Sequence, residues 1–252
     1  GGVPRDGYTG AFTSLSAWGA IARDAADTRL LTEALLDRAL PGGDGSRLRV
    51  GLVRAPYWDD CDPAVSAACE AALDAAGWEC RDLELSGGEH VQTAGMVRTM
   101  CELAPATPAD VLAAADPLVR AYALYAQLWP AMLLARADRV RAQLRVDLAA
   151  AFEQVDLIAW PTVPAPAPLL DAAVVELPSG TIPADAANVR QATAGNLAGV
   201  PGISVPVASH PTGLPQGLQL LAPWGAEARL LDAAAHLEQA TGRACVDACP
   251  PL

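Results

Sequence analysis

The order of hydrophobic and polar residues in the first third of the chain predicts a strand, a helix and a second strand. Residues 48–53 (LRVGLV) form a short apolar run that is typical of a buried strand. A helix begins at Asp62 and Pro63, because proline is tolerated in the first helical turn, and it ends at Gly77. Residues 78–85 form the second strand. A strand, a helix and a strand with short connections indicate an α/β fold.

The middle of the chain has the spacing of helices and no strand pattern. This helical segment runs over about residues 89–152, and prolines divide it into shorter helices at Pro105, Pro108, Pro117 and Pro130. Residues 155–160 (VDLIAW) then form an apolar strand that ends at Pro161. We expect no regular element between Pro161 and Pro183, where prolines are dense, and loops of this length are usually functional or mobile.

The last third of the chain predicts a helix, two strands and a closing helix. Residues 189–197 have a short helical pattern, and residues 203–207 alternate as in a half-buried strand. After a turn rich in glycine and proline, residues 218–221 form the next strand. The final helix runs over about 227–240 and ends at Gly242.

The chain has 252 residues and a formal net charge of −12, and all 17 of its basic residues are arginine. Without lysine, these residues contain no Schiff-base lysine, lysine general base or phosphate-loop lysine. An acidic chain with no basic run also argues against nucleic acid as a partner, because such binding depends on neutralised phosphates. The hydrophobic fraction of 52% is typical of a globular protein with a buried core.

The sequence also bears on the compartment in which the protein works. No apolar run approaches the roughly 20 residues that a membrane-spanning helix needs, so we expect no membrane association. The first residues, GGVPRDGYTGAF, lack the pattern of a signal peptide. The six cysteines stand at irregular spacings, which in a chain of this length favours reduced, mostly buried thiols over a disulfide framework. We therefore expect a cytoplasmic protein.

The common catalytic motifs are absent from the sequence, which has no GxSxG, no HExxH and no phosphate-binding glycine loop. The acidic residues within 59–62 precede a helix, where the helix dipole favours them, so we interpret them as structural. His236, Cys245 and Cys249 lack the spacing of a structural zinc site. We expect neither a metal nor another cofactor.

Two groups of side chains at helical spacing have both a functional and a structural interpretation. The first group consists of four arginines: Arg136, Arg139, Arg141 and Arg145. These arginines either bind an anionic ligand or form a solvated helix face with ion pairs, and we favour the solvated face. The second group is a stripe of large apolar side chains: Leu118, Tyr122, Tyr125 and Trp129. This stripe either lies in the core or lines a pocket, and we favour the core.

Four segments occur in an order that resembles a known family. Residues 193–206 read TAGNLAGVPGISVP, and residues 213–221 read GLPQGLQLL. Upstream, VDLI at 155–158 leads to PTVP at 161–164, and SLSAWG stands at 14–19. These segments resemble the amidase signature hydrolases, and they cover both ends of the chain in the order that the family has.

The resemblance implies a fold and a position within it. The fold is α/β, with a mixed sheet covered by helices and a helical insertion around residues 89–152. The chain, residues 1–252, is then the C-terminal portion of a single α/β domain, with a sheet-forming segment over about 153–252. The Lys–cis-Ser–Ser apparatus of the family lies N-terminal to the matching part, so we expect no catalytic residue here. The sequence departs from the family at Ser16, usually an aspartate, and at Ala192, usually a threonine.

The resemblance also implies an activity and a partner. The activity is hydrolysis of a C–N amide bond of a small molecule through a serine acyl-enzyme, without a cofactor. The partner is the catalytic N-terminal half of the domain, from the same gene or a separate chain, and a homodimer is a further option. Two alternatives stay open: a non-catalytic amidase-like scaffold or regulatory subunit, and an independent α/β module that binds a small molecule. A half-domain should leave an interface on the order of 2,000 Å² or more for its partner.

Five residues are candidates for substrate contacts. Thr162 follows the end of a strand, where an open α/β sheet forms its ligand crevice. Tyr125 and Trp129 are the next candidates, as walls of an apolar channel if their stripe lines a pocket and not the core. Thr193 and Asn196 belong to the segment that matches the family. For Asn196 we favour a buried position that anchors neighbouring loops by hydrogen bonds over a contact with substrate.

Overall fold

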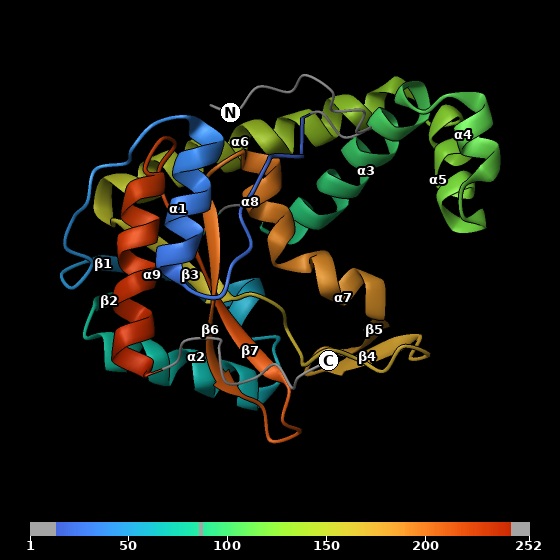
Figure 1. The fold of residues 1–252 in the computed structure, drawn as a ribbon. Helices are drawn as coiled ribbons and strands as arrows, with labels where there is room; N and C mark the ends of the chain where they lie inside the picture. The colour runs from blue at the N-terminus through green and yellow to red at the C-terminus, as the bar shows by residue number, and fades with distance from the viewer. Residues whose placement is uncertain (1–13, 86–87, 243–252) are drawn as a thin grey trace.

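The computed structural model describes residues 14–85 and 88–242, and its centre is a sheet with helices on both faces (Figure 1). Five strands make this sheet: β1 (Arg49–Val53), β2 (Glu79–Leu83), β3 (Leu157–Pro161), β6 (Gly202–Ser209) and β7 (Pro215–Leu221). Their order is β2-β1-β3-β7-β6. Strand β1 pairs in parallel with β2 and β3, whereas β7 pairs antiparallel with β3 and β6. The prediction of an α/β fold with a mixed sheet is confirmed.

The first strand, helix and strand form where the local sequence predicts them. Helix α2 (Pro63–Ala76) begins after Asp62, whose Oδ1 accepts a hydrogen bond from the backbone N of Ala64 at 2.8 Å. The helix ends at Gly77, which has a φ of 66° and so adopts the left-handed conformation that glycine tolerates. Strands β1 and β2 flank this helix in the chain and pair in parallel, so the predicted strand–helix–strand unit is confirmed.

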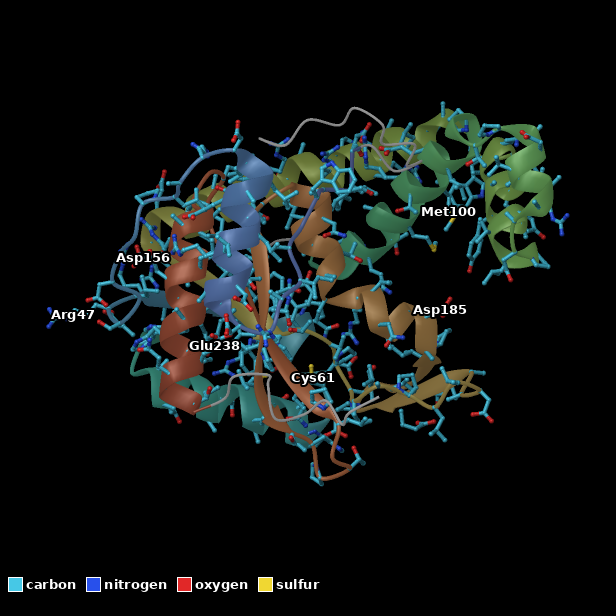
Figure 2. The ribbon with its side chains drawn as sticks, viewed as in Figure 1. Arg47, Cys61, Met100, Asp156, Asp185 and Glu238 are labelled. Carbon is cyan, nitrogen blue, oxygen red and sulfur yellow. The ribbon has the colours of Figure 1, made fainter. Side chains whose placement is uncertain are left out.

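Different helices cover the two faces of the sheet. Helices α2 and α9 (Glu227–Thr241) pack on the face that carries the buried Val205, and α1 (Ala25–Leu36) lies against α9. Glu238 joins this pair, because its carboxylate accepts hydrogen bonds of 3.0 Å from the backbone N of Ala25 (Figure 2). Helix α8 (Ala192–Ala198) lies on the opposite face, where a Cβ on Gly195 would come within 3.2 Å of Leu221.

Strand β6 forms one edge of this sheet. Its register with β7 is regular from Gly202 to Pro206 and shifts between Pro206 and Ala208, so the strand is irregular in its second half. On the other edge, β2 is a short strand whose residues are mostly exposed. The well-packed part of the sheet is therefore its middle, formed by β1, β3 and β7.

The helical insertion is confirmed and consists of four helices: α3 (Gly88–Ala106), α4 (Ala109–Ala114), α5 (Pro117–Gln127) and α6 (Ala131–Gln154). Pro108, Pro117 and Pro130 stand at helix starts, as predicted. Pro105 does not separate two helices, because it lies in the last turn of α3. Helices α3 and α6 pack together, and α4 and α5 lie at their far end, away from the sheet (Figure 1).

The segment between Pro161 and Pro183 contains a hairpin, so the prediction of no regular element there is wrong. Strands β4 (Val174–Leu177) and β5 (Gly180–Pro183) pair antiparallel around a turn in which Gly180 has a φ of 123°. These strands are short and mostly exposed, so they lack the apolar alternation that reveals a strand in sequence. The helix expected over 189–197 is likewise two helices, α7 (Ala184–Arg190) and α8.

None of the helices within residues 14–85 and 88–242 is long and apolar enough to cross a membrane. Cys61 and Cys69 are buried free thiols, as expected, whereas Cys80 is a free thiol on the surface. Cys245 and Cys249 lie outside the residues that the structure describes.

Candidate functional site

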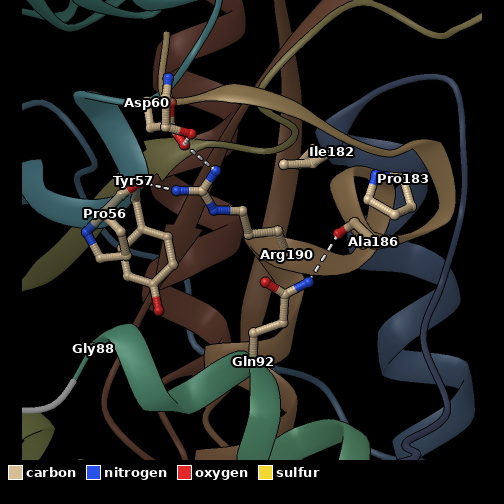
Figure 3. Close-up of a pocket in the computed structure, with 10 residues that line it drawn as sticks. Pro56, Tyr57, Asp60, Gly88, Gln92, Ile182, Pro183, Ala186 and Arg190 are labelled. Carbon is tan, nitrogen blue, oxygen red and sulfur yellow. Dashed lines mark hydrogen bonds and ion pairs between the residues drawn. The ribbon is translucent and has the colours of Figure 1, made fainter. Parts of the chain in front are cut away.

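A cavity of about 370 Å³ lies beneath the β4–β5 hairpin, within the size range of small-molecule sites (Figure 3). Its walls come from the π-helical turn η1 (Arg54–Trp58), the start of α3, the hairpin and α7. The polar side chains in its lining are Tyr57, Asp60, Gln92, Ser179 and Arg190. Because η1 follows β1 directly, the cavity lies near the carboxyl ends of the parallel strands β1 and β3. This is the edge at which open α/β sheets bind ligands.

An ion pair between Asp60 and Arg190 joins two walls of the cavity. Arg190 Nη1 lies 2.5 Å from Asp60 Oδ2, and its Nη2 donates to the backbone oxygen of Pro56 at 2.9 Å. The side chains are only 15% and 13% exposed, so this pair is largely withdrawn from water. Ser179 donates to the same carboxylate from its backbone N and its hydroxyl, both at 2.8 Å. One carboxylate thus binds both the hairpin and α7.

The protonation state of Asp60 follows from these contacts. Burial raises the pKa of this carboxyl, but the hydrogen bonds from Arg190 and Ser179 outweigh burial and lower the pKa below its ordinary value. Asp60 is therefore charged at neutral pH, and it compensates the charge of Arg190. The charges of Asp60 and Arg190, the two ionic groups in the lining of the cavity, therefore cancel.

An aromatic stack supports one wall of the cavity. The ring of Tyr57 lies on that of the fully buried Trp160, with 4.4 Å between ring centroids and 17° between planes. Trp160 Nε1 in turn donates to the backbone oxygen of Gln191 at 3.2 Å, which links β3 to the junction of α7 and α8. Because Trp160 is enclosed on all sides, it fixes the ring of Tyr57 at the cavity.

Cys61 lies beside this stack, and it is not a nucleophile. Its thiol donates to the backbone oxygen of Tyr57 at 2.8 Å, and only 3% of the residue is exposed. Burial raises the pKa of Cys61 to about 12, so the thiol stays protonated at neutral pH. Cys61 therefore supplies no reactive thiolate beside the cavity. The polar side chains of the lining can serve recognition of a ligand.

Thr162 lies at the end of β3, as expected, but its partners are on neighbouring strands and it does not line the cavity. Its hydroxyl lies 2.6 Å from that of Ser204 on β6, and its backbone N donates to the oxygen of Gly217 at 2.8 Å. A Cβ on Gly217 would come within 2.8 Å of Ser204 Oγ and 2.9 Å of Thr162 Oγ1. The absence of a side chain at 217 allows these two hydroxyls to meet over β7.

Thr193 and Asn196 lie on α8, and they have different surroundings. Thr193 donates from its hydroxyl to the backbone oxygen of Val189 at 2.7 Å, and its methyl faces Gly95 of α3 so closely that a Cβ there would clash at 2.4 Å. Thr193 thus packs two helices together. Asn196 is exposed, so the interpretation of this residue as a buried anchor is wrong. Its neighbours Gly195 and Leu197 on the short helix take the buried positions.

Tyr125 and Trp129 lie far along the helical insertion, and the stripe to which they belong is not a core. Tyr125 is 62% exposed and Leu118 is 53% exposed, whereas Ala123 and Ala126 are the buried residues of α5. Trp129 is half-buried and packs against the core. The interpretation as core fails for Leu118 and Tyr125, because α5 packs mainly on α3 and these two side chains stay largely exposed.

The arginines of α6 do not form one cluster. Arg136 and Arg139 are exposed, which fits the solvated face that we favour. Arg145 lies over the ring of Trp224 at 5.4 Å from its centroid. Arg141 is half-buried, and burial followed by the charges of Arg98 and Arg145 lowers its pKa. Asp138, an acidic residue of the same helix, pairs with Arg98 of α3.

The described ranges contain no group of three or more histidine, cysteine, aspartate or glutamate side chains placed to hold a metal. His236 has its Nε2 2.9 Å from the backbone oxygen of Ala76, and its ring lies 5.8 Å from that of Trp78. It therefore joins α9 to the end of α2, and its position is accounted for by these contacts.

Comparison with known protein families finds one whose model matches most of this chain. The family model described as "Amidase" matches residues 1–231. The chain belongs to the amidase family. Its relatives within that family include a glutamyl-tRNA(Gln) amidotransferase subunit of Azotobacter vinelandii (strain DJ), which is 31% identical over 96% of this chain and 58% of the relative. They also include 2-amino-5-chloromuconic acid deaminase of Comamonas testosteroni, which is 30% identical over 95% of this chain and 54% of the relative.

A solved amidase has the same arrangement of elements. The structure described as "Crystal structure of amidase" superposes with a TM-score of 0.81 at 26% identity, over 89% of this chain and 52% of that one. The chain thus spans little more than half the length of the amidase-family proteins it matches. The resemblance that the sequence motifs indicate is confirmed, together with the fold that it implies.

The cavity depends on residues that no local sequence pattern singles out. The sequence predicts a structural role for Asp60 at the start of α2, and it gives Arg190 no role. Asp60 and Arg190 are 130 residues apart in the chain, and no local sequence pattern reveals a pair at such a distance. The sequence signal that could have pointed to Asp60 is the group of acidic residues at 59–62. A helix needs only one cap, and Asp62 provides it for α2. The capping of α2 by Asp62 leaves Asp60 free for another role.

Proposed function

We propose that this chain is the C-terminal part of an amidase-type serine hydrolase that cleaves the C–N amide bond of a small molecule. The proposal rests on membership of the amidase family together with the absence of lysine from all 252 residues. A neutral lysine is the proton relay that the resemblance implies. The relatives are longer than this chain, so the catalytic serine, the bridging serine and the lysine are expected in the remainder of such a protein or in a partner chain.

The observation that carries the proposal is the apolar surface of α1 and the preceding residues. Ile21 is 96% exposed, Leu30 is 66% exposed and Leu31 is 44% exposed, although α1 packs on α9 with its other side. Soluble monomers seldom leave such residues together on the surface. Strand β6 also has no partner on its outer side among the described strands. An additional segment that covers α1 and extends the sheet at β6 accounts for both features.

In this proposal, the chain contributes to substrate binding and the additional segment contributes the chemistry. The serine hydroxyl attacks the amide carbonyl, the amine leaves with a proton from the relay, and water then hydrolyses the acyl-enzyme. Backbone N–H groups near the serine stabilise the oxyanion. No cofactor is needed. Thr162, which follows β3 and pairs with Gly217 of β7, and the cavity beside Tyr57 are the parts of this chain that we place closest to the substrate.

A second candidate function is that of a non-catalytic amidase-like scaffold or regulatory subunit. Two departures from the family favour it, Ser16 in place of aspartate and Ala192 in place of threonine. The relative from Azotobacter is named as a subunit, so an assembly with other chains is compatible with both candidates. The expectations of a cytoplasmic location and of a homodimer belong to the same proposal.

The coding sequence around this chain tests the proposal first. We expect a glycine- and serine-rich signature with a lysine further upstream, either in the same gene or in a neighbouring one. The chain produced together with that segment should release ammonia or amine from simple amides, and substitution of the signature serine by alanine should abolish this release. Assembly without hydrolysis of any amide would favour the scaffold. A chain that is monomeric alone and binds no dye of apolar surfaces would contradict both.

A further inference from the structure

Helix α5 is apolar around most of its circumference, although only one side of it is covered. Ala123 and Ala126 are its buried residues, and α3 is the element that it contacts most. A helix that is hydrophobic on every side is normally enclosed by other elements. The side of α5 that points away from its buried residues is therefore suited to meet another surface.

Four residues at helical spacing define this side, which we call the outer face of α5: Leu118, Ala121, Tyr125 and Leu128. Intervals of three, four and three residues place them along one line of the helix. Leu128 directly follows α5 and keeps a right-handed helical conformation, so it continues that line. It is 79% exposed, and Leu118 and Tyr125 are exposed as well. A contiguous apolar patch of this kind marks an interaction site.

None of the four residues is charged. Arg120 and Gln127 are seven residues apart and follow a different line of the helix. Arg120 donates from Nη1 to the backbone oxygen of Ala113 at 3.2 Å, and Asp116 caps α5 by accepting from the backbone N of Leu118 at 2.8 Å. The whole chain has a net charge of −12, so the outer face is a neutral part of an acidic molecule. At such a place two copies repel each other least.

The order of large and small residues on the outer face is complementary to itself. We consider a second α5 that lies antiparallel across the first, with a two-fold axis at the level of residue 123. Leu118 of one copy then faces Leu128 of the other, and Ala121 of one copy faces Tyr125 of the other. The small side chain of Ala121 leaves space for the ring opposite. A two-fold dimer requires this kind of surface, which is the same on both copies and fits itself.

The position of α5 in the molecule also favours a second copy. Helix α5 lies at the far end of the helical insertion, away from the sheet and from α1 (Figure 1). Two copies can therefore join through α5 while α1 and the edge of β6 stay available to the additional segment of the proposed function. A lipid surface is a weaker fit, because helices that lie on membranes have basic residues on their polar side, and α5 has only Arg120.

From these features we propose that the outer face of α5 binds the same face of a second copy, so that the chain forms a two-fold dimer with antiparallel α5 helices. The inference goes beyond the proposed function, which gives a homodimer no surface, and it uses none of the residues that carry that function. Two helices form a small interface between acidic copies, so we expect a dissociation constant of about 1–100 µM. Well below that concentration the copies separate, and α5 is exposed as in the single chain.

Sedimentation equilibrium of the 252-residue chain over a range of concentrations tests for the dimer. Association should strengthen by about threefold or more when the salt concentration is raised from about 0.05 M to about 0.5 M, because salt screens the repulsion between two acidic copies. A chain that stays monomeric up to about 1 mM would overturn the inference. Association that weakens as salt is added would also overturn it, because such a contact depends on ion pairs.

Charges placed on the outer face test the antiparallel pairing. Leu118→Glu and Leu128→Arg each bring a charge against a leucine of the other copy, and each variant alone should dimerise at least about tenfold more weakly. In an equimolar mixture, position 118 of one variant faces position 128 of the other, so opposite charges meet and a heterodimer should form. An acid in the first turn and a base at the end suit the dipole of α5, so both variants should fold. A mixture that stays monomeric would overturn the antiparallel arrangement.

Two control variants add the same charge elsewhere. Val146→Glu, at a residue of α6 that is 62% exposed, and Leu30→Glu, on the apolar surface of α1, should both leave the dimer intact. Loss of association in Leu30→Glu but not in Leu118→Glu would place the contact on α1 and overturn the inference. Binding of a monomeric wild type to phosphatidylcholine vesicles, lost in Leu118→Glu, would assign the outer face to lipid and overturn it as well. No readout depends on amide hydrolysis, so the proposed function is tested separately.

Discussion

Strand β3 and helix α5 are both rich in large hydrophobic side chains, and the structure treats them in opposite ways. Leu157, Ile158 and Trp160 of β3 are fully buried, whereas Leu124 and Tyr125 of α5 are 52% and 62% exposed. Strand β3 has β1 and β7 beside it and elements on both faces, while α5 packs mainly on α3. The comparison teaches that hydrophobic residues predict burial only where the fold supplies neighbours on every side.

The largest expected effect is in the middle of the sheet. Trp160→Ala removes a fully buried ring, its stack on Tyr57 and its hydrogen bond to Gln191. We expect the free energy of unfolding to fall by about 3–5 kcal/mol, the usual cost of a large-to-small substitution in a core. Denaturant unfolding measures the change. Trp224→Ala, at a tryptophan that is 39% exposed, is the matched control, and a similar loss in both variants would contradict the contrast.

The hairpin lies between the two extremes, because one carboxylate, that of Asp60 in the turn before α2, binds both the hairpin and α7. Asp60→Asn weakens the contacts to Arg190 and Ser179, and we expect it to lower the free energy of unfolding by about 1.5–3 kcal/mol at pH 7. The pKa of Asp60 is lowered in the folded state, so its contribution is complete above the unfolded value of about 3.9 and is lost as the pH falls through the folded pKa.

The pH dependence provides the measurement for this ion pair. Unfolding of the wild type and of Asp60→Asn is compared from pH 7 down to the acid limit of the fold. The difference between the two should stay constant down to about pH 5 and shrink below about pH 4. A difference that grows as the pH falls would show that Asp60 is not held in its charged form.

A smaller effect is expected where strands β3, β6 and β7 meet. Gly217→Ala forces a methyl group against the paired hydroxyls of Thr162 and Ser204, and we expect a loss of about 1–2 kcal/mol in the free energy of unfolding. In a Ser204→Ala background the loss should decrease, because one of the two crowded oxygens is gone. Gly42→Ala, with no atom near its Cβ position, is the control. Equal costs at the two glycines would contradict the close approach.

The smallest effect is expected on the arm formed by α4 and α5. Tyr125→Ser and Leu128→Gln should change the free energy of unfolding by no more than about 0.5 kcal/mol, since both residues are mostly exposed. The same changes should reduce the fluorescence of a dye that binds apolar surfaces. A loss above about 1.5 kcal/mol would break the comparison, because it would show that this surface is packed in solution.

Local patterns predict those elements whose signals are local. The strands β1, β3 and β7 stand out by their apolar runs, β6 by its alternation, and helix α2 by its proline and glycine boundaries. The β4–β5 hairpin has no such signal, because its strands are short and exposed. It owes its position to Ser179 and Asp60, which are 119 residues apart in the chain.

The candidate site is predictable only in part. The motif that contains Thr162 points to the edge of the sheet at which the cavity lies, since Thr162 follows β3 by one residue and Tyr57 stacks on Trp160 of the same strand. The pairing of Asp60 with Arg190 depends on how α7 folds back over η1, and this is a property of tertiary structure. The helical spacing of Tyr125 identifies the face that it shares with its neighbours, but not what covers that face.

The irregular second half of β6 has a consequence for handling the protein. An exposed strand edge is a template on which copies of a chain aggregate, and natural proteins often interrupt such edges with proline or a bulge. Pro206 supplies no N–H for an incoming strand, and the register shift that follows it ends regular pairing. Uninterrupted addition is therefore confined to the short stretch from Gly202 to Val205. Any fibrous precipitate of this chain should form more readily once Pro206 is replaced by threonine or valine.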